Sequence, residues 1–487
     1  MITVQLDREG FEYDIHSLVK AFYPETDVKV FLQGTKDLRS DETLPELVIL
    51  RDESRIEAQL WKGAERRLAA SVTEPLCDHP DKARIKNQIK NIIYRMLLKE
   101  TGKQLPWGTL TGIRPTKIAM GLLEQGKGRE DILQYMRETY DVSREKVVLS
   151  VDIAEREKRI LADIHYRDGY SLYIGIPFCP TTCLYCSFTS FPIALWRERV
   201  TEYLEALKKE MEAAADLMQG RILDSVYIGG GTPTTLSAEE LEYLIRELKR
   251  KFNFETVKEF TVEAGRADSI TEDKLRVLKK YGVTRISVNP QTMNDKSLKL
   301  IGRQHTVAQV EEAFRLARRC GFDNINMDLI LGLPGEDEED VRRTVEAVKA
   351  LQPDSLTVHS LAIKRASKLN QWIQENGIQT LHNTDETMRI AAEAAESMGL
   401  LPYYLYRQKN MSGNFENVGY AREGCYGIYN ILIMEEKQTI MALGAGTITK
   451  RVYPDGRIER CDNVKEVALY IEKIDEMIER KRRLFED

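Results

Sequence analysis

The chain has 487 residues, of which 42% are hydrophobic and 30% are charged, and its formal net charge at pH 7 is −6. This length predicts two or three domains, and the composition is that of an ordinary globular protein. The negative charge excludes a general electrostatic attraction to nucleic acid. Because no apolar run approaches about 18 residues and the N-terminus lacks a signal-peptide pattern, we expect a cytoplasmic protein without a membrane span.

Short apolar runs separated by turn residues predict strands in the first part of the chain. These runs cover 3–6, 28–32, 47–50, 56–61 and 67–72. Helical periodicity then dominates from 83 to about 163, including 131–140 and 145–157. We interpret 1–165 as a separate small α+β domain without a catalytic motif.

The segment 82–117 combines basic residues with apolar residues at helical spacing. This pattern predicts an amphipathic helix whose basic face lies in solvent. A second interpretation is that the basic face binds a polyanion, such as an RNA or a porphyrinogen with several carboxylates.

From residue 171 onward, the sequence alternates between predicted strands and helices. The strands cover 171–176, 225–228, 259–263, 285–289, 324–329 and 355–360. The helices between them cover 197–218, 238–252, 271–281, 307–320 and 338–350. This alternation predicts an α/β fold with a parallel sheet, here a partial (β/α)6 TIM-type barrel over 166–374. We expect 375–487 to cover the open side of the barrel, with helices near 386–398 and 464–484.

Three of the seven cysteines form a C-x-x-x-C-x-x-C pattern after the first predicted barrel strand: Cys179, Cys183 and Cys186. Thiolates are the usual ligands of iron–sulfur clusters, so three on one loop can bind three irons of a [4Fe–4S] cluster and leave the fourth iron open. A structural zinc site would need a fourth ligand, and an odd number disfavours disulfides. The isolated cysteines are interpreted as small buried hydrophobic residues: Cys77, Cys320, Cys425 and Cys461.

Further motifs accompany the cysteines in a definite order. They are Tyr173-Ile174-Gly175-Ile176-Pro177-Phe178, Gly229-Gly230-Gly231-Thr232-Pro233-Thr234, 285–291, Gly302-Arg303 and 327–335. Over 170–460 this arrangement resembles the radical S-adenosylmethionine (SAM) superfamily and, within it, the oxygen-independent coproporphyrinogen III oxidase group. With the run 106–117 in its N-terminal extension, the chain resembles the HemZ-type coproporphyrinogen dehydrogenase branch.

The resemblance implies two cofactors, a [4Fe–4S] cluster ligated by the three motif cysteines, and SAM. The implied cofactor-binding residues are Tyr173, Gly230, Gly231, Thr232, Glu263, Gln291, Arg303, Asp328 and Ala362. By resemblance, the glycine loop binds the methionine amino group and Glu263 binds the ribose hydroxyls. Gln291 and Arg303 are expected to contact the ribose and the methionine carboxylate.

Tyr173 matches a family tyrosine beside the cluster and the substrate, so it is also a candidate catalytic residue. The alternatives from residue type are a core role for Tyr173 and a structural ion pair for Arg303 and Asp328. Phe178 and Phe188 flank the cluster loop and are expected to pack there and exclude water.

The resemblance implies an oxidoreductase of haem biosynthesis that converts coproporphyrinogen III to protoporphyrinogen IX by oxidative decarboxylation. The expected partners are the porphyrinogen, or haem, and an electron donor such as flavodoxin or ferredoxin. Two positions depart from the group's pattern: Phe188 replaces a fourth cysteine and Gly175 replaces a histidine. A haem-binding chaperone of the same fold is therefore the alternative. An RNA-modifying enzyme ranks third, because the chain has no recognisable RNA-binding module.

Overall fold

The computed structural model describes residues 1–33, 46–63, 65, 67–78, 80–112, 114–364, 367–408 and 411–486. The chain folds into two compact units. Unit 1 comprises Met1–Ala154 and Tyr406–Glu416, and unit 2 comprises Glu155–Leu405 and Asn417–Asp487. A segment from the last fifth of the chain therefore belongs to the unit that is otherwise N-terminal, which the sequence pattern does not indicate.

Unit 1 contains a five-stranded mixed sheet in the order β2-β1-β3-β4-β5. Its strands are β1 (Ile2–Leu6), β2 (Val28–Leu32), β3 (Glu46–Arg51), β4 (Arg55–Lys62) and β5 (Arg67–Pro75). β1 pairs in parallel with β2 and β3, whereas β4 is antiparallel to β3 and β5. The parallel pair β1–β2 needs a crossover, which helix α1 (Glu12–Phe22) provides. The sequence analysis predicts all five strands but misses this helix.

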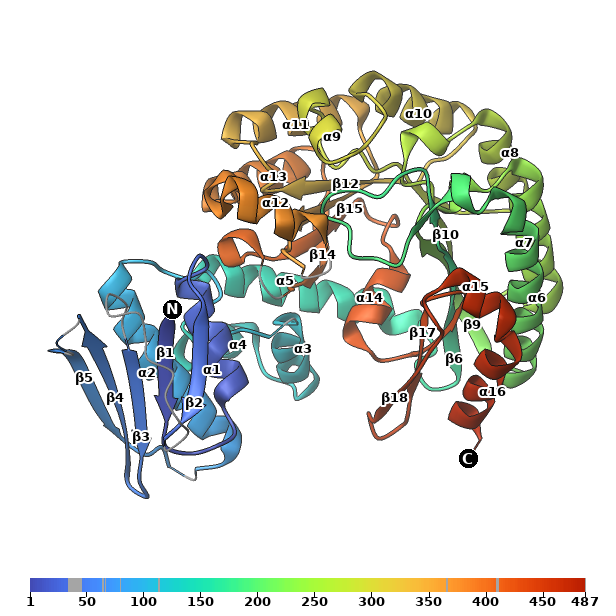
Figure 1. Ribbon diagram of the computed structural model, residues 1–487. Coiled ribbons are helices and arrows are strands. Elements are labelled where there is room, and N and C mark those ends of the chain that lie inside the picture. The colour runs from blue at the N-terminus through green and yellow to red at the C-terminus, as the bar shows by residue number, and fades with distance from the viewer. Residues whose placement is uncertain are drawn as a thin grey trace. The chain divides into compact units, whose positions relative to one another are not determined.

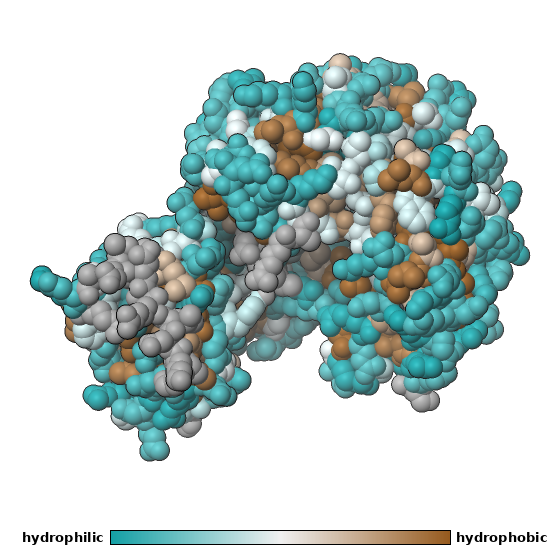
Figure 2. All heavy atoms as spheres, in the orientation of Figure 1, coloured by the Kyte–Doolittle hydropathy of each residue, from teal (hydrophilic) through white to brown (hydrophobic). Residues whose placement is uncertain are grey.

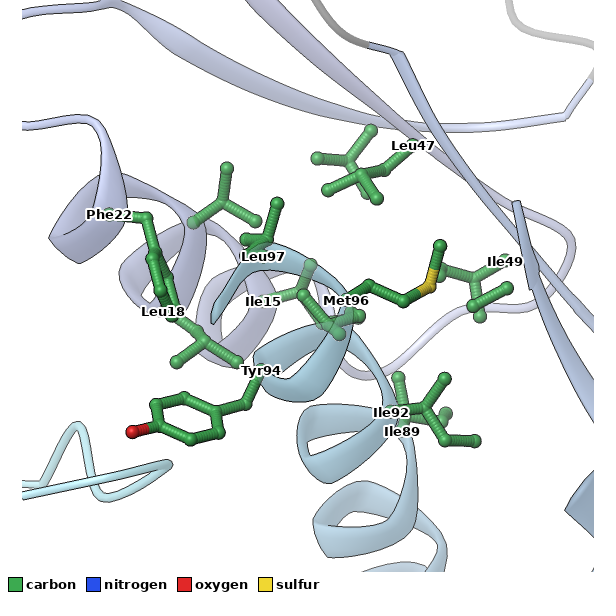
Figure 3. Close-up of a cluster of buried hydrophobic side chains, with 14 of the residues drawn as sticks. Ile15, Leu18, Phe22, Leu47, Ile49, Ile89, Ile92, Tyr94, Met96 and Leu97 are labelled. Carbon is green, nitrogen blue, oxygen red and sulfur yellow. The ribbon is translucent and has the colours of Figure 1, made fainter. Parts of the chain in front are cut away.

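The core of unit 1 lies between the sheet and two helices, α1 and α2 (Lys82–Thr101) (Figure 3). Buried residues of α1, α2 and β3 meet there: Ile15, Leu18, Phe22, Ile89, Ile92, Leu97, Leu47 and Ile49. The N-cap of α2 is Asp81, whose side chain accepts a hydrogen bond from the Arg84 N–H, and the helix ends at Gly102 in a left-handed conformation. The other helices are α3 (Thr116–Glu124), α4 (Arg129–Tyr140) and α5 (Arg144–Ile160), which continues into unit 2.

Unit 2 is built on an 11-stranded sheet in the order β14-β15-β13-β12-β11-β10-β9-β6-β16-β17-β18. At its centre are six parallel strands, namely β6 (Gly169–Ile176), β9 (Ile222–Gly230), β10 (Glu259–Glu263), β11 (Arg285–Ser287), β12 (Ile325–Leu331) and β13 (Ser355–Ser360). The helices between them form an outer layer (Figure 1): α6 (Val200–Leu217), α7 (Ala238–Lys251), α8 (Glu272–Lys280), α10 (Val307–Arg319) and α11 (Glu338–Leu351). A short helix, α9 (Asp295–Leu300), follows β11. The predicted α/β class with six β/α units is confirmed.

The C-terminal part of unit 2 adds strands to both edges of the same sheet. β14 (Leu401–Tyr406) and β15 (Asn417–Ala421) extend it beyond β13. β16 (Thr439–Leu443), β17 (Ile448–Val452) and β18 (Ile458–Asp462) extend it beyond β6. The helices here are α12 (Lys368–Asn376), α13 (Asp385–Ser397), α14 (Ile428–Glu435), α15 (Val467–Glu472) and α16 (Ile474–Phe485). The sequence analysis expects only helices in this region, because pairing with the distant edges β6 and β13 leaves no local signal.

A buried carboxylate joins the C-terminal helices to α6. Glu210 accepts hydrogen bonds from the Gly444 N–H (2.8 Å), the Tyr470 hydroxyl (2.6 Å), the Asn463 amide (2.7 Å) and the Lys481 ammonium (2.7 Å). With four donors around it, this buried charge is fully satisfied. The network therefore holds β16 and α16 against the outer layer of the barrel.

The face of the molecule drawn in Figure 2 is mostly hydrophilic, with separate smaller apolar areas. None of the helices in the described ranges combines the length and the apolar character needed to cross a bilayer.

Candidate functional site

The cysteine loop follows the carboxyl end of β6 and is held from several sides. Its first residues form the short strand β7 (Phe178–Cys179), which pairs with β8 (Phe191–Pro192). The Thr181 hydroxyl donates a hydrogen bond to the Gly302 carbonyl (2.9 Å), and the Leu184 N–H donates to the Ile301 carbonyl (2.9 Å). The loop is therefore fixed to the segment that follows β11, so the first and fourth predicted motifs meet.

The three cysteine thiols lie near one another and near hydrogen-bond donors. Cys179 Sγ is 3.5 Å from the Thr232 hydroxyl oxygen. Cys186 accepts a hydrogen bond from the Phe188 N–H. Burial raises the pKa of both Cys179 and Cys186, and the charges of the neighbouring cysteines raise it further. Such a set of clustered thiols with nearby donors fits the ligation of an iron–sulfur cluster by thiolates.

In the part of the chain that the structure describes, no three His, Cys, Asp or Glu side chains converge on the position of a single metal ion. A cubane cluster makes a different demand, because each thiolate ligates a separate iron.

Two buried arginines accompany the cysteine loop, and the sequence analysis singles out only one of them. Arg303 donates a hydrogen bond to the Asn289 carbonyl (2.5 Å). Burial alone would lower the pKa of Arg303, but the nearby Tyr185 and Cys183 groups raise it above its usual value. Arg266, which was missed, has Nη1 3.9 Å from Cys183 Sγ and 2.9 Å from the Thr181 hydroxyl. Arginine charges beside the sulfurs favour the thiolate form that a metal requires. The one sequence feature that could have identified Arg266 as a site residue is its position just after β10.

Arg266 is itself held in place by an acidic partner. Its guanidinium forms a bidentate pair with Asp268, at 3.0 and 2.6 Å. His305 Nδ1 lies 3.6 Å from the same carboxylate, and burial lowers the pKa of this histidine. The histidine therefore lies beside the Arg266–Asp268 pair.

The glycine loop after β9 packs directly against the cysteine loop. The Gly231 N–H donates to the Ile176 carbonyl (2.8 Å), and the Thr232 N–H donates to the Phe178 carbonyl (2.7 Å). A Cβ at Gly231 would lie 2.5 Å from the Phe178 carbonyl oxygen, so only glycine fits there. The Gly230 N–H donates to Glu263. All three N–H groups are thus occupied, so a ligand ammonium group could bond only to carbonyl oxygens of this loop.

Glu263 ends β10 and lies partly buried beside the glycine loop. The Tyr227 hydroxyl of β9 donates a hydrogen bond to Glu263 Oε1 (2.6 Å). Burial raises the pKa of Glu263 to about 7, the nearby Asp328 charge adds to this, and the hydrogen bonds from Tyr227 and Gly230 oppose it. The carboxylate therefore has acceptor capacity left for hydroxyl groups, as the sequence analysis expects for a ribose.

The remaining predicted residues lie at or after β11, β12 and β13. Gln291 adopts a left-handed backbone conformation, with φ of 70°, and is held there because its N–H donates to the Asp328 carbonyl (2.9 Å). The Asp328 side chain accepts from Asn326 (2.7 Å) and lies 3.9 Å from His359, which together hold its pKa down against the effect of burial. The contacts of Arg303 and Asp328 are with other residues, so an ion pair between these two is excluded, while Asp328 has His359 within ion-pair distance. Ala362 lies two residues beyond β13.

Tyr173 of β6 belongs to a stack of three tyrosines inside the barrel. Its ring centroid lies 6.0 Å from that of Tyr227 and 5.7 Å from that of Tyr429, and the last two lie 4.6 Å apart. Tyr429 comes from α14, in the C-terminal region. The sequence analysis names only Tyr173, because the three residues are distant along the chain.

Two buried acceptors near this site have no hydrogen-bond partner among the described residues. They are the Ser287 hydroxyl and Asn289 Oδ1, at the carboxyl end of β11. Buried polar atoms without a partner are uncommon and indicate a bound group or water. Together with the thiols and the adjacent glycine loop, these atoms fit a site that holds a cluster and a polar cofactor.

The structure corrects several expectations. Phe178 is fully buried, but the side chain of Phe188 is 76% exposed and does not shield the loop. Of the isolated cysteines, only Cys461 is buried, whereas Cys77, Cys320 and Cys425 are partly exposed. The histidine missing at Gly175 has a steric cause, because a Cβ there would lie 2.5 Å from the Thr447 methyl group, supplied by the C-terminal strands.

Comparisons with known proteins agree with this geometry. The model of the radical SAM superfamily matches residues 173–348. The oxygen-independent coproporphyrinogen-III oxidase-like protein HemZ of Bacillus subtilis is 40% identical over 407 residues, which cover 82% of this chain and 81% of that protein. This match is longer than the whole chain after residue 165, so it includes N-terminal residues.

The heme chaperone HemW of Bacillus subtilis is 32% identical over 309 residues, covering 63% of this chain and 76% of that protein. Among solved structures, coproporphyrinogen III oxidase (HemN) of Escherichia coli matches the fold with a TM-score of 0.51 at 23% identity, covering 66% of this chain and 72% of that chain. The chain therefore belongs to the radical SAM superfamily and, within it, to the HemN/HemZ family.

Proposed function

We propose that the protein is an oxygen-independent oxidative decarboxylase that acts on the propionate side chains of coproporphyrinogen III. The superfamily's cofactors are a [4Fe–4S] cluster and SAM. When bound, they supply a carbon-centred radical that removes a hydrogen atom from an unactivated carbon. The protein's part is then to orient the cofactor and the substrate. An external one-electron donor such as flavodoxin or ferredoxin is needed, together with a one-electron acceptor for the electron that the substrate releases as it loses carbon dioxide.

The residues after β6 and β9 are suited to hold the two cofactors. Cys179, Cys183 and Cys186 would ligate the cluster, with Arg266 beside the Cys183 sulfur (3.9 Å) to stabilise the thiolate form. The carbonyls of the glycine loop would accept from the methionine ammonium of SAM, because the loop's own N–H groups are already occupied.

The residues further along the barrel are suited to the nucleoside and the carboxylate. Glu263 would accept from the ribose hydroxyls, and Arg303 would pair with the methionine carboxylate. Gln291 and Asp328 would add polar contacts, and Ala362 would lie near the adenine. Tyr173 would form part of the wall beside the substrate, as one member of the tyrosine stack.

The observation that carries the decarboxylase proposal is the extent of similarity to the coproporphyrinogen-III oxidase-like protein HemZ. The 40% identity extends over 82% of this chain and so includes both units. The test is an anaerobic reaction of the cluster-loaded chain with coproporphyrinogen III, SAM and a reductant, followed by mass spectrometry. Loss of carbon dioxide to give protoporphyrinogen IX supports the proposal. SAM cleavage without any change in the porphyrinogen contradicts it.

A haem chaperone is the second candidate, because the HemW of Bacillus subtilis shares 32% identity and because Phe188 stands in place of a fourth cysteine. For this function, stoichiometric haem binding and transfer to an apoprotein should occur without decarboxylation. Haem titration followed by absorbance, run with the same preparation as the decarboxylase assay, distinguishes the two candidates.

A further inference from the structure

Unit 1 contains two buried cations that have no acidic partner. Lys90 of α2 is 6% exposed, and Arg407 of the segment Tyr406–Glu416 is 4% exposed. Among the described residues neither of them forms an ion pair. The sequence analysis expects the basic face of this helix to lie in solvent, so the burial of Lys90 is a correction.

Both cations face one loop of unit 1. Lys90 Nζ donates to the Thr111 hydroxyl (2.9 Å), and Arg407 Nη1 donates to the carbonyl of the adjacent Leu110 (2.5 Å). The Arg407 guanidinium also lies over the Trp107 ring, 5.7 Å from its centroid, and its Nε is buried without a partner. Burial lowers the pKa of Lys90 to about 8, the charges of Lys86 and Arg407 add to this, and the charge of Asp14 opposes it.

Two carboxylates lie near enough to act electrostatically on the pair, Asp14 on Lys90 and Glu416 on Arg407, and each already has another basic partner. Glu416 accepts from Lys146 Nζ at one oxygen (2.7 Å) and from Trp107 Nε1 at the other (2.7 Å). Asp14 pairs with Lys86 and Glu416 pairs with Lys146, so among the described residues Lys90 and Arg407 are buried without an ion pair of their own. Burying such charges is strongly unfavourable unless a counter-charge accompanies them.

The hydrogen-bond donors that remain unused around the two cations indicate what kind of ligand would bind there. Lys90 has three N–H donors and one bonded partner, the Thr111 hydroxyl hydrogen is free to turn, and Arg407 Nε is unpaired. All of these groups donate hydrogen bonds, so the matching ligand carries acceptor oxygens and negative charge.

We propose that unit 1 binds an oxyanion, phosphate or carboxylate, between Lys90, Thr111 and Arg407. The site lies within one unit and is separate from the cysteine loop, so it does not rest on the proposed function. Two sources share this chemistry: a phosphate group, free or on a larger ligand, and a carboxylate such as a porphyrin propionate.

The test is isothermal titration calorimetry on the full-length, cluster-loaded chain at constant ionic strength. Inorganic phosphate is the probe in one arm and coproporphyrin III in the other. Lys90→Met removes one charge with little change of shape. Lys99→Met, at an exposed position of the same helix α2, is the matched control. We expect one of the two probes to bind Lys90→Met at least about tenfold more weakly than the wild type, and to bind Lys99→Met with unchanged affinity.

The arm that shows this Lys90 dependence identifies the source of the oxyanion. The proposal is overturned if neither probe's affinity depends on Lys90. Thermal unfolding adds an independent readout of the same question. If phosphate and coproporphyrin leave the wild-type Tm unchanged while Lys90→Met raises it, the cations are simply uncompensated and no ligand site exists.

Discussion

Buried carboxylates in unit 2 have very different partners, and these partners decide which carboxylate can receive a ligand. Glu210 accepts from four donors and is purely structural. Glu263 accepts from Tyr227 and Gly230 and keeps acceptor capacity. Glu157 of α5 has no hydrogen-bond partner among the residues that the structure describes, and burial and the nearby Glu435 raise its pKa well above the usual range. The same side chain therefore has a different role at each of these positions because its surroundings differ.

Substitution of single cysteines tests the assignment of the iron–sulfur cluster ligands. Cys183→Ala should abolish iron loading and SAM cleavage, because two thiolates remain where three are needed. Cys320→Ala at the end of α10 is the matched control and should leave both unchanged. Iron and sulfide analysis with EPR of the reduced protein measures the loading. Wild-type cluster content in the Cys183 variant would refute the assignment.

The raised pKa of Glu263 predicts a pH dependence of SAM binding. With a pKa of about 7 the group is mostly protonated at pH 6 and ionised at pH 8. The ionised form accepts stronger hydrogen bonds from hydroxyls, so SAM affinity should fall by up to about tenfold between pH 8 and pH 6. Glu263→Gln should bind more weakly at pH 8 and show a flat profile. Calorimetry measures both, and an unchanged pH profile in the variant would contradict the assigned contact.

At the scale of elements, a buried carboxylate of the barrel holds the N-terminus of α14. Glu259, at the start of β10, accepts hydrogen bonds from the N–H groups of Ile428 and Tyr429 (3.3 Å for Tyr429), the first two residues of α14. This is the arrangement in which an anion satisfies the free N–H groups of a helix N-terminus. Because α14 carries Tyr429, Glu259 also positions the tyrosine stack.

Glu259→Gln should lower the free energy of unfolding by about 2–4 kcal/mol, because the amide cannot replace a charged acceptor beside Arg285. Urea unfolding followed by circular dichroism measures this loss. Glu346→Gln, on the exposed side of α11, is the control and should change stability by less than about 0.5 kcal/mol. Equal effects of the two changes would mean that Glu259 does not anchor α14.

At the scale of the whole molecule, the chain leaves unit 1, builds most of unit 2, and returns to unit 1 for Tyr406–Glu416. The return is fixed by Glu416, which binds Trp107 across 309 residues of sequence, and by Arg407, which donates to the Leu110 carbonyl. Unit 1 is thus incomplete without a segment from the end of the chain. A fragment that stops near residue 154 would lack both of these partners.

Glu416→Gln should destabilise unit 1 by about 3–5 kcal/mol, because the buried Lys146 loses its buried counter-charge and keeps only the exposed Glu145, at 3.6 Å. The double change Lys146→Met with Glu416→Gln should recover much of this loss, since both charges are then removed. Hydrogen exchange of α2 and α5 amides in the full-length chain reports the stability of unit 1 directly. Additive effects of the two changes would show that the pair is not coupled.

The sequence by itself determined the features that depend on near neighbours in the chain. Cys179, Cys183 and Cys186 lie within one loop, so their spacing was enough to indicate a cluster. The strands and helices of the barrel were predictable because their apolar periodicity is local. The glycine loop that contains Gly231 could be recognised because it is short. The ordered motifs also pointed to the family, which the comparisons confirm.

Only the tertiary structure decided the rest, because the burial of a charged or aromatic side chain depends on which distant segment packs against it. Arg266 became part of the cysteine environment, and Tyr429 joined Tyr173, through contacts between separate elements. Lys90 has the same basic residue type as its exposed neighbours on α2, yet it is buried beside Arg407. Residue type and spacing carry no information on such long-range pairing, which is set by how the elements pack in three dimensions.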